Sequence, residues 1–420
     1  SIGPTVICRP FVLRELTQEN AILTGVSSVN NSYVGPNTRY GQGEVKIPGG
    51  KLVRVTVQQH DHHESQAIID GDFFLEEESS EVLDRAQQIL NEQLADLPRD
   101  WENWQADEYF AYYRRLADRL TAVLADVLVG VNGEAIALAF MRALLSGTTN
   151  EHAREQERAF EQIRETRVKQ QVERAQTGTA RAEQLISAEE IARRWSQLSL
   201  EVFVDIPRMP AEEMRVDKVW AEQVAAGQRP PTLRFWNWAA PAVVCGKYQS
   251  IADEVNLEYA REQGIQIVRR DTGGGAMFIE PANTITFSLY APLSFVDGLD
   301  ARQSFQLCDA WLIKALADCG ISAHYAGLND IASDRGKIGG AAERRFAGDP
   351  GCLLHHDTLA YGIDTEKMSK VLRVSAEKMS DKAVKSASKR VDPMNTQTSW
   401  SRERIVNQME RTAREFSAKH

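Results

Sequence analysis

The chain has 420 residues, a length that exceeds one small hydrophobic core and predicts two domains. Hydrophobic residues make up 43% and charged residues 26%, which is typical of a globular protein and argues against a disordered one. The formal net charge of -10 argues against nucleic acid as a partner, because no global basic field would attract it.

Cysteine usage and hydropathy narrow the class further. Five cysteines without a CxxC pair or a zinc-type spacing predict reduced thiols in a cytoplasmic protein. No run approaches about eighteen uninterrupted apolar residues, so we expect no membrane span and no membrane partner. The start of the chain lacks methionine and a basic segment, so no signal peptide is expected.

The first predicted domain covers residues 1–148, and its periodic pattern begins at about residue 44. Residues 51–75 contain two stretches that alternate between apolar and polar side chains, which predicts two strands. Helical spacing follows over residues 80–94 and 106–128. A two-stranded sheet covered by helices predicts a small α+β module.

Two polar stretches are interpreted as connections. The "HDHHES" run at 60–65 could suggest zinc, but it is interpreted as a polar turn between the two strands. Residues 149–185 contain few large apolar residues and alternate charges of both signs at helical spacing. This pattern predicts a solvated helical linker between two domains, with a binding surface as the alternative.

The second predicted domain covers residues 186–420 and is also α+β. Helical patterns cover 214–227 and 301–320, and basic helical segments close the chain. Strands are predicted over the following stretches: 233–238, 242–249, 265–271, 283–291, 334–346 and 353–364. Strands joined mostly by short turns and flanked by a few long helices favour this fold class.

The stretch "RRDTGGGAMFIEPANTITFSL" at 269–289 combines two arginines with three consecutive glycines. Glycines let backbone N–H groups approach an anion closely, and Arg270 would supply a charge that does not titrate away. The stretch is neither a Walker loop nor GxGxxG. The alternative is an ordinary hairpin turn beside solvated arginines.

Two further patches of this domain could contribute to the same site. Lys337 lies among small and apolar residues in "LNDIASDRGKIGGAAERR", a setting that suits contact with a ligand, with a solvent-facing strand lysine as the alternative. His355 and His356 are adjacent, so on a strand they point to opposite faces and cannot chelate one metal together. We therefore expect one of them to line a site and the other to pack.

These patches together are similar to a known family. In order and spacing, "RRDTGGGAMF", "NDI…GKIGGAA" and "LLHHDTLAYGID" resemble the catalytic domain of the lipoate–protein ligases. "FWNWAAPAVVCGKYQ" and "DKAVKSASKRVDPM" are similar to the flanking segments, so the resemblance covers 200–400. Residues 44–145, with "KIPGGKLVRVTV" and "IIDGDFFL", resemble the family's small accessory domain, which here comes first.

The resemblance implies a mixed-sheet domain of the biotin/lipoate ligase type and an activity. Such enzymes use ATP and magnesium to make lipoyl-adenylate, and pass the lipoyl group to one lysine of a lipoyl-carrier domain. That carrier would be a 2-oxoacid dehydrogenase acyltransferase subunit, a glycine-cleavage H protein or a similar protein. The accessory domain would close over the substrates during activation and then move away.

The resemblance also implies roles for individual residues. Lys337 would be catalytic and bridge the lipoyl carbonyl and the α-phosphate, while Arg270 would hold phosphate. Asn329 and Asp330 would contact the nucleotide or magnesium, and no residue is predicted as a fixed metal ligand. The residues expected to bind ATP or the adenylate are Arg270, Gly274, Gly275, Ala276, Met277, Phe278, Asn283, Asn329, Asp330, Gly340, Ala342, His356 and Thr358.

Departures from the family pattern leave alternatives open. Ile279 and Glu280 replace a frequent His-Asp pair, Gly339 replaces a serine, and Asp357 replaces a glycine. A related class transfers octanoyl groups through a cysteine thioester, and Cys352 is the candidate nucleophile here. A biotin ligase would have a Gly-Arg-Gly-Arg run, which is absent, and a non-catalytic carrier-binding protein is the third alternative.

Overall fold

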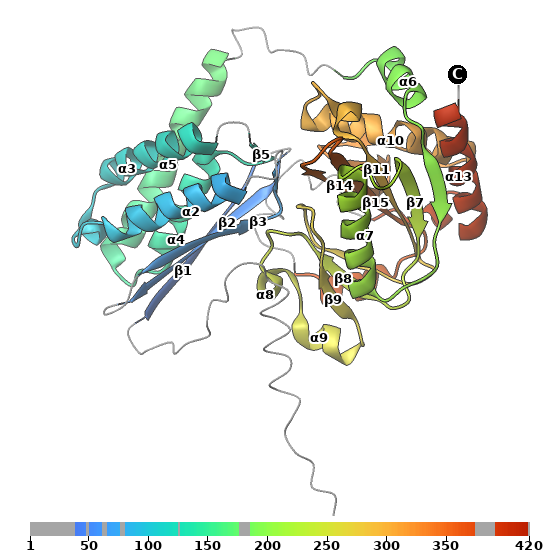
Figure 1. Cartoon of the computed structure of the whole chain (residues 1–420). Helices are drawn as coiled ribbons and strands as arrows, with labels where there is room; N and C mark the ends of the chain where they lie inside the picture. Colours follow the sequence, from blue (N-terminus) through green and yellow to red (C-terminus); the bar gives the residue numbers. More distant parts are fainter. Residues whose placement is uncertain are drawn as a thin grey trace, which may run out of the picture.

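The computed structural model describes residues 38–47, 50–60, 65–75, 80–124, 127–175, 185–373 and 391–418. These residues form two units, an N-terminal unit up to residue 175 and a C-terminal unit from residue 185, which lie side by side (Figure 1). Most of the "HDHHES" run, most of "DKAVKSASKRVDPM" and Cys8 lie outside the described residues.

The N-terminal unit is built on an antiparallel sheet with the strand order β1-β2-β3, plus a short β4–β5 pair. The sequence predicted two strands, and the structure adds β1, whose two glycines weaken its apolar alternation. The strands are β1 (Thr38–Lys46), β2 (Leu52–His60), β3 (Gln66–Gly71), β4 (Phe74–Leu75) and β5 (Leu128–Val129).

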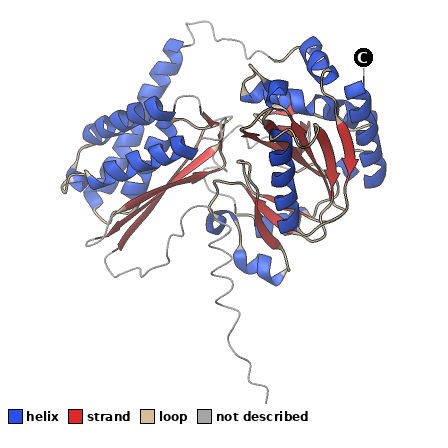
Figure 2. Ribbon diagram, viewed as in Figure 1, coloured by secondary structure: helices blue, strands red, loops and turns tan. Residues whose placement is uncertain are grey.

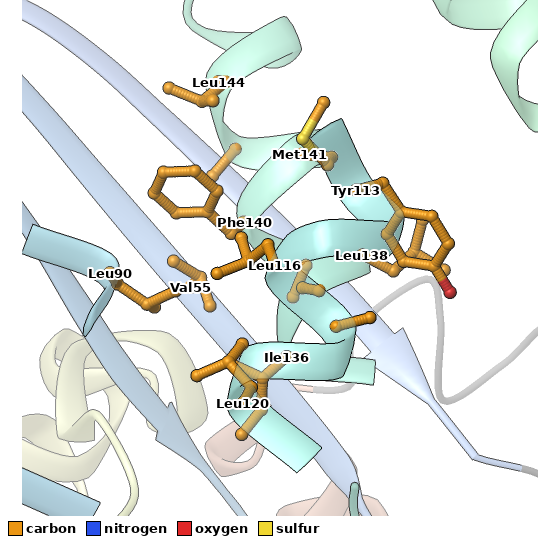
Figure 3. Close-up of a cluster of buried hydrophobic side chains, with 14 of the residues drawn as sticks. Val55, Leu90, Tyr113, Leu116, Leu120, Ile136, Leu138, Phe140, Met141 and Leu144 are labelled. Carbon is orange, nitrogen blue, oxygen red and sulfur yellow. The ribbon is translucent and has the colours of Figure 1, made fainter. Parts of the chain in front are cut away.

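Helices cover one face of this sheet, as Figure 2 shows. They are α2 (Ser80–Ala95), η1 (Trp101–Asn103), α3 (Ala106–Leu124), α4 (Gly133–Ser146) and α5 (Glu151–Ala175). Figure 3 shows the core between them, in which Val55 of β2, Leu116 of α3 and Phe140 of α4 meet. Helix α4 was not expected from the sequence because it is apolar on nearly every face, which removes the amphipathic signal.

Helix α5 covers the first part of the predicted linker. Ala153 and Phe160 are fully buried in the core of the N-terminal unit, so this part of the helix packs on that unit. Residues 176–184 lie outside the described part of the chain. The structure therefore limits any free connection to the stretch after α5, and the domain boundaries stay a prediction.

The C-terminal unit contains two sheets. A large sheet has the order β12-β13-β14-β15-β11-β7-β6, and a small one has the order β10-β8-β9. Both are mixed, because β6–β7 and β8–β9 run parallel and the other pairs antiparallel.

The bounds of the strands follow the predicted stretches closely, with four further short strands. The strands are β6 (Glu201–Val204), β7 (Thr232–Trp236), β8 (Ala242–Cys245), β9 (Gln266–Arg269), β10 (Met277–Ile279), β11 (Thr284–Ala291), β12 (His324–Ala326), β13 (Asp330–Ser333), β14 (Gly336–Phe346) and β15 (Cys352–Ala360).

Helices cover both faces of the large sheet. Helices α10 and α13 pack on one face around Phe287, Leu312 and Met409, and α7 lies on the other face, against β11 and β15. The helices are α6 (Ala188–Ser196), α7 (Pro210–Ala225), α8 (Ile251–Glu254), α9 (Leu257–Glu262), η2 (Leu293–Val296), α10 (Ala301–Asp318), α11 (Thr365–Val371), η5 (Met394–Thr396) and α13 (Arg402–Ala418). The predicted α+β class is confirmed.

The two units are in direct contact. Arg54 on β2 is only 2% exposed, and its guanidinium donates to Asp70 within its own unit and to Glu254 of the C-terminal unit, at 2.7 and 3.2 Å. The rings of Phe73 and Tyr248 stack with their centroids 5.1 Å apart. In the part of the chain that the structure describes, no helix combines the length and apolar character of a bilayer span.

Candidate active site

A cavity of about 700 Å³ lies between the two units. Thirteen of the fourteen site residues predicted from the sequence line it, although they come from four separate segments, 270–278, 329–330, 337–342 and 356–358. They are Arg270, Gly274, Gly275, Ala276, Met277, Phe278, Asn329, Asp330, Lys337, Gly340, Ala342, His356 and Thr358. This volume lies in the range of ligand sites in proteins.

The three glycines place the loop against the N-terminal unit. A Cβ added to Gly273 would lie 2.2 Å from the carbonyl oxygen of Phe73, which no side chain tolerates. The N–H of Gly274 donates to that same oxygen at 3.3 Å, and its φ of +90° favours glycine. The loop is therefore shaped by the docking of the two units as well as by the cavity.

Arg270 lies behind the glycine loop and is only 5% exposed. Its guanidinium donates to the carbonyl oxygens of Gly273 and Gly275, at 2.6 and 2.9 Å, and to that of Val244 at 3.2 Å. Burial lowers the pKa of this guanidinium to about 10. The carbonyl oxygens of the protein accept from most of its N–H groups. Arg270 therefore holds the loop in shape, whereas the sequence pattern had predicted a contact with phosphate.

Lys337 faces Asp330 across the β13–β14 pair. Its Nζ donates to Asp330 Oδ1 at 2.7 Å, and its side chain is 39% exposed. A register shift between Ile331 and Ala332 occurs beside this pair. A Cβ at Gly340 would lie 2.8 Å from the Lys337 Nζ, so this glycine leaves the space that the ammonium group occupies.

The N-terminal unit supplies a second lysine, which sequence reasoning missed. Lys51 precedes β2, lines the cavity and donates from Nζ to Asn329 Oδ1 at 2.7 Å. Burial lowers the pKa of Lys51 to about 8, and the charges of Asp330 and Asp72 limit the decrease. Lys46 and Asp72 line the cavity as well. The signal was present in "KIPGGKLV", which places two lysines around a turn, but only the docked fold shows where they point.

His356 connects the glycine loop to the core. Its Nε2 lies 2.7 Å from Thr272 Oγ1, and its Nδ1 lies 2.6 Å from Asp217 Oδ2. Ser288 and Tyr290 both donate to Asp217, at 2.5 and 2.6 Å. His355 is buried and faces α10 instead, so one of the two adjacent histidines lines the cavity and the other packs.

Asn283 is the predicted site residue that the structure does not bring to the cavity wall. Its backbone carbonyl accepts from the N–H groups of Tyr361 and Gly362, and its amide contacts Glu280. Glu280 in turn pairs with Lys367 at 2.8 Å. Asn283 therefore supports a turn beside β15. Glu280, which departs from the family pattern, also lies outside the cavity wall.

Gly339, which replaces a serine of the family pattern, has a steric reason. A Cβ on Gly339 would lie 2.4 Å from Leu359 Cδ2 on the neighbouring strand β15. The same Cβ would lie 2.7 Å from the backbone carbonyl oxygen of Thr358, so a serine at this position would push β14 and β15 apart. Glycine here keeps the strands at pairing distance beside Lys337 and Gly340.

Part of the cavity wall is apolar and comes from the C-terminal unit. These side chains are Met277, Phe278, Ile338, Ile363, Met368, Leu372 and Val391. The same cavity thus offers an apolar surface, three lysines (Lys46, Lys51 and Lys337), and the carboxylates of Asp72 and Asp330. The carboxylates and the Asn329 amide are oxygen donors of the kind that bind Mg²⁺ together with a phosphate.

Cys352, the candidate nucleophile of the transferase alternative, does not line the cavity. It is fully buried at the start of β15 among Tyr290, Phe346 and Leu354. Burial raises the pKa of Cys352 and of the three other described cysteines, Cys245, Cys308 and Cys319. Among the residues with described positions, therefore, no thiol is exposed and activated for attack.

The C-terminal unit is thus an α+β domain whose glycine-rich loop and lysine meet in one partly apolar cavity. Residues 209–414 match the family model of the lipoyl protein ligase A/B catalytic domain. This match confirms the resemblance of the C-terminal unit to the family's catalytic domain, while the resemblance of the N-terminal unit to an accessory domain stays a prediction. The mixed-sheet fold of the biotin/lipoate ligase type is confirmed with it.

Similar proteins include both ligases and transferases. The chain is 34% identical to lipoate-protein ligase LplJ of Bacillus subtilis, over 36% of this chain and 43% of the relative. It is 31% identical to lipoate–protein ligase 1 of Staphylococcus aureus, over 36% and 44%. Octanoyltransferase LipM of Lysinibacillus sphaericus is 24% identical, over 41% and 70%. The alignments thus span less than half of the first two relatives, and the relatives include both lipoate ligases and octanoyltransferases.

Solved structures of the same class are also similar. The bipartite lipoate protein ligase of Thermoplasma acidophilum, described with its E2 lipoyl domain, shares 26% identity over 52% of this chain and 84% of that one, with a TM-score of 0.45. A lipoate-protein ligase A bound with ATP shares 23% identity over 52% and 85%, with a TM-score of 0.42.

Proposed function

We propose that the protein is an ATP-dependent lipoate–protein ligase, which activates lipoate to lipoyl-AMP and transfers the lipoyl group to a carrier lysine. The observation that carries the proposal is the position of Lys337 and Lys51 in one cavity that also has an apolar wall. The lysines suit the phosphates and the carboxylate, and the apolar side chains suit the lipoyl chain and ring. The relatives named lipoate-protein ligase support it.

In the first step, a lipoate carboxylate oxygen would attack the α-phosphorus of ATP and pyrophosphate would leave. Negative charge on the expanding phosphorus would be stabilised by Lys337 and by the backbone N–H groups of the loop at 274–278. Magnesium, when bound, would neutralise part of the phosphate charge, with Asp330 and Asp72 as the carboxylates that fit it. Asp330 would also hold Lys337 in position, since the two groups lie 2.7 Å apart.

In the second step, the amine of the carrier lysine would attack the lipoyl carbonyl, and AMP would leave. The new amide bond forms as the mixed anhydride bond breaks, and the proton lost by the amine goes to water. Lys337, which would contact the carbonyl oxygen, stabilises the charge that develops there.

The N-terminal unit would serve as the accessory domain and complete the cavity. It supplies Lys51, Lys46 and Asp72 to the wall, and its Phe73 carbonyl holds the glycine loop. These contacts support a closed, activation-competent arrangement. Transfer then requires the unit to move, because the carrier lysine must reach the same cavity.

The runner-up is an octanoyltransferase, which the LipM relatives favour. That reaction needs a cysteine thiolate that can reach the acyl group. The buried positions and raised pKa values of the four described cysteines argue against it. A lipoyl-carrier domain is the proposed acceptor in either case, and a cytoplasmic location stays a prediction.

A pyrophosphate-release assay on the full chain tests the proposal. We expect release with ATP, magnesium and lipoate, weaker release with octanoate, and none with biotin. No release with lipoate or octanoate, combined with octanoyl transfer from an acyl-carrier thioester, would replace the ligase by the transferase.

A further inference from the structure

A second cluster of polar groups lies under the large sheet, on the face opposite the cavity. His355 and Asp357 alternate along β15 with His356 and Thr358, which line the cavity. They point toward α10, where Asp309 meets them, and all three side chains are buried. One donor atom from each of Asp309, His355 and Asp357 lies within 4.8 Å of the other two.

Carboxylates contact both ring nitrogens of His355. Its Nδ1 lies 2.9 Å from Glu343 Oε1, and Ser304 Oγ donates to the other Glu343 oxygen at 2.8 Å. The opposite ring nitrogen, Nε2, faces Asp309 Oδ1 at 2.8 Å. In metal sites, a histidine commonly binds the ion through one ring nitrogen while a carboxylate holds the other nitrogen. Glu343 would be that carboxylate, and Nε2 would face the ion.

Asp357 has no hydrogen-bond partner. Its side chain is 1% exposed, and neither carboxylate oxygen has a partner among the described residues. Burial of a carboxyl group without a partner is unfavourable, and protonation alone would still leave its O–H without an acceptor. The lipoate ligase pattern has a glycine here, so this chain has added the group that lacks a partner.

We propose that Asp309, His355 and Asp357 bind a zinc-class divalent cation. Two carboxylates and one imidazole are ligands of zinc, whereas magnesium and calcium prefer oxygen donors throughout. Ligands about 2.1 Å from a tetrahedral ion lie about 3.4 Å apart. The three donor atoms here lie within 4.8 Å of one another, so one ion could contact all three after the side chains adjust. The ion would give both oxygens of Asp357 a counter-charge that the protein does not supply.

The ion takes no part in adenylate chemistry. It joins α10 to β15, and the other face of β15 presents His356 and Thr358 to the cavity. The cation therefore stabilises the part of β15 that forms the cavity wall. The inference does not depend on whether the enzyme is a ligase or a transferase.

The test is the zinc content of the full chain after equilibration with zinc chloride and desalting. We expect about one tightly held zinc ion per chain and a higher melting temperature with zinc than after chelation. Asp357→Asn and His355→Gln should each lose the ion and the shift in melting temperature. Asp318→Asn, an exposed change on the same helix, should keep both.

A control excludes binding by the histidine-rich run at 60–65, whose three histidines are replaced by glutamine. That variant should retain the zinc and its melting shift. Cobalt(II) substitution of the unmodified chain gives a second readout, visible absorption bands from a low-symmetry nitrogen and oxygen site, lost in Asp357→Asn. A metal-free wild type after zinc exposure, or undiminished zinc in both Asp357→Asn and His355→Gln, would overturn the proposal.

Discussion

Replacing Lys51 by methionine should weaken ATP binding although Lys51 lies outside the catalytic domain. Methionine keeps most of the apolar stem and removes the charge that lies 2.7 Å from Asn329. A hydrogen bond from a charged group contributes about 1.5–3 kcal/mol. The dissociation constant for ATP should therefore rise between about 10-fold and 150-fold.

The pH dependence gives this prediction a specific signature. Because burial lowers the pKa of Lys51 to about 8, the ammonium form is lost as the pH rises through 8. About nine-tenths of Lys51 is charged at pH 7 and about one-tenth at pH 9, so the affinity for ATP should fall about tenfold over this range. Lys51→Met should remove this part of the pH dependence.

Isothermal titration calorimetry with a non-hydrolysable ATP analogue at pH 7 and pH 9 measures both effects. Lys314→Met is the matched control, since Lys314 is exposed on α10 and pairs only with Asp318 among the described residues. Equal affinities for wild type and Lys51→Met at pH 7, with the same pH slope, would show that Lys51 does not contact the nucleotide.

Three further predictions address the cavity. Lys337→Ala should keep the wild-type melting temperature within a few degrees and lose about 100-fold in pyrophosphate release, because one charge at the reacting phosphate is gone; wild-type release would remove Lys337 from the mechanism. Cys352→Ser should keep at least about half of the ligase activity, since the thiol is buried away from the cavity; complete loss with an intact circular dichroism spectrum would favour the thioester route. Gly275→Arg should weaken ATP binding more than folding, because a Cβ there meets nothing closer than 3.5 Å and the longer side chain would extend toward the cavity; unchanged ATP affinity in calorimetry would place the nucleotide elsewhere.

Much of the architecture could be predicted from local patterns. Strands such as β11 and β15 were clear because they combine β-branched and apolar residues over eight or nine positions. Helix α4 gave no amphipathic signal because it is buried on nearly all sides. Helix α5 was assigned to a solvated linker because nearly all of its residues are polar or charged. Phe160 nevertheless anchors it in the core, and so few apolar residues give no clear signal in the sequence.

The candidate site was harder to predict where it depends on contacts between units. Lys337 could be selected from its small neighbours, whereas Lys51 acquires its role only when the N-terminal unit docks. Arg270 lines the cavity, but its hydrogen bonds to loop carbonyls could not be predicted from composition. Asn283 matched a motif and yet supports a turn, because motif spacing does not reveal which way a side chain points.

The central claim is tested most directly by intact-protein mass spectrometry of a lipoyl-carrier domain incubated with the full chain. With ATP, magnesium and free lipoate, we predict lipoylation of one lysine, and none when ATP is omitted or when Lys337→Ala replaces the wild type. Acylation of the carrier from an octanoyl thioester without ATP, together with no modification from ATP and lipoate, would contradict the account.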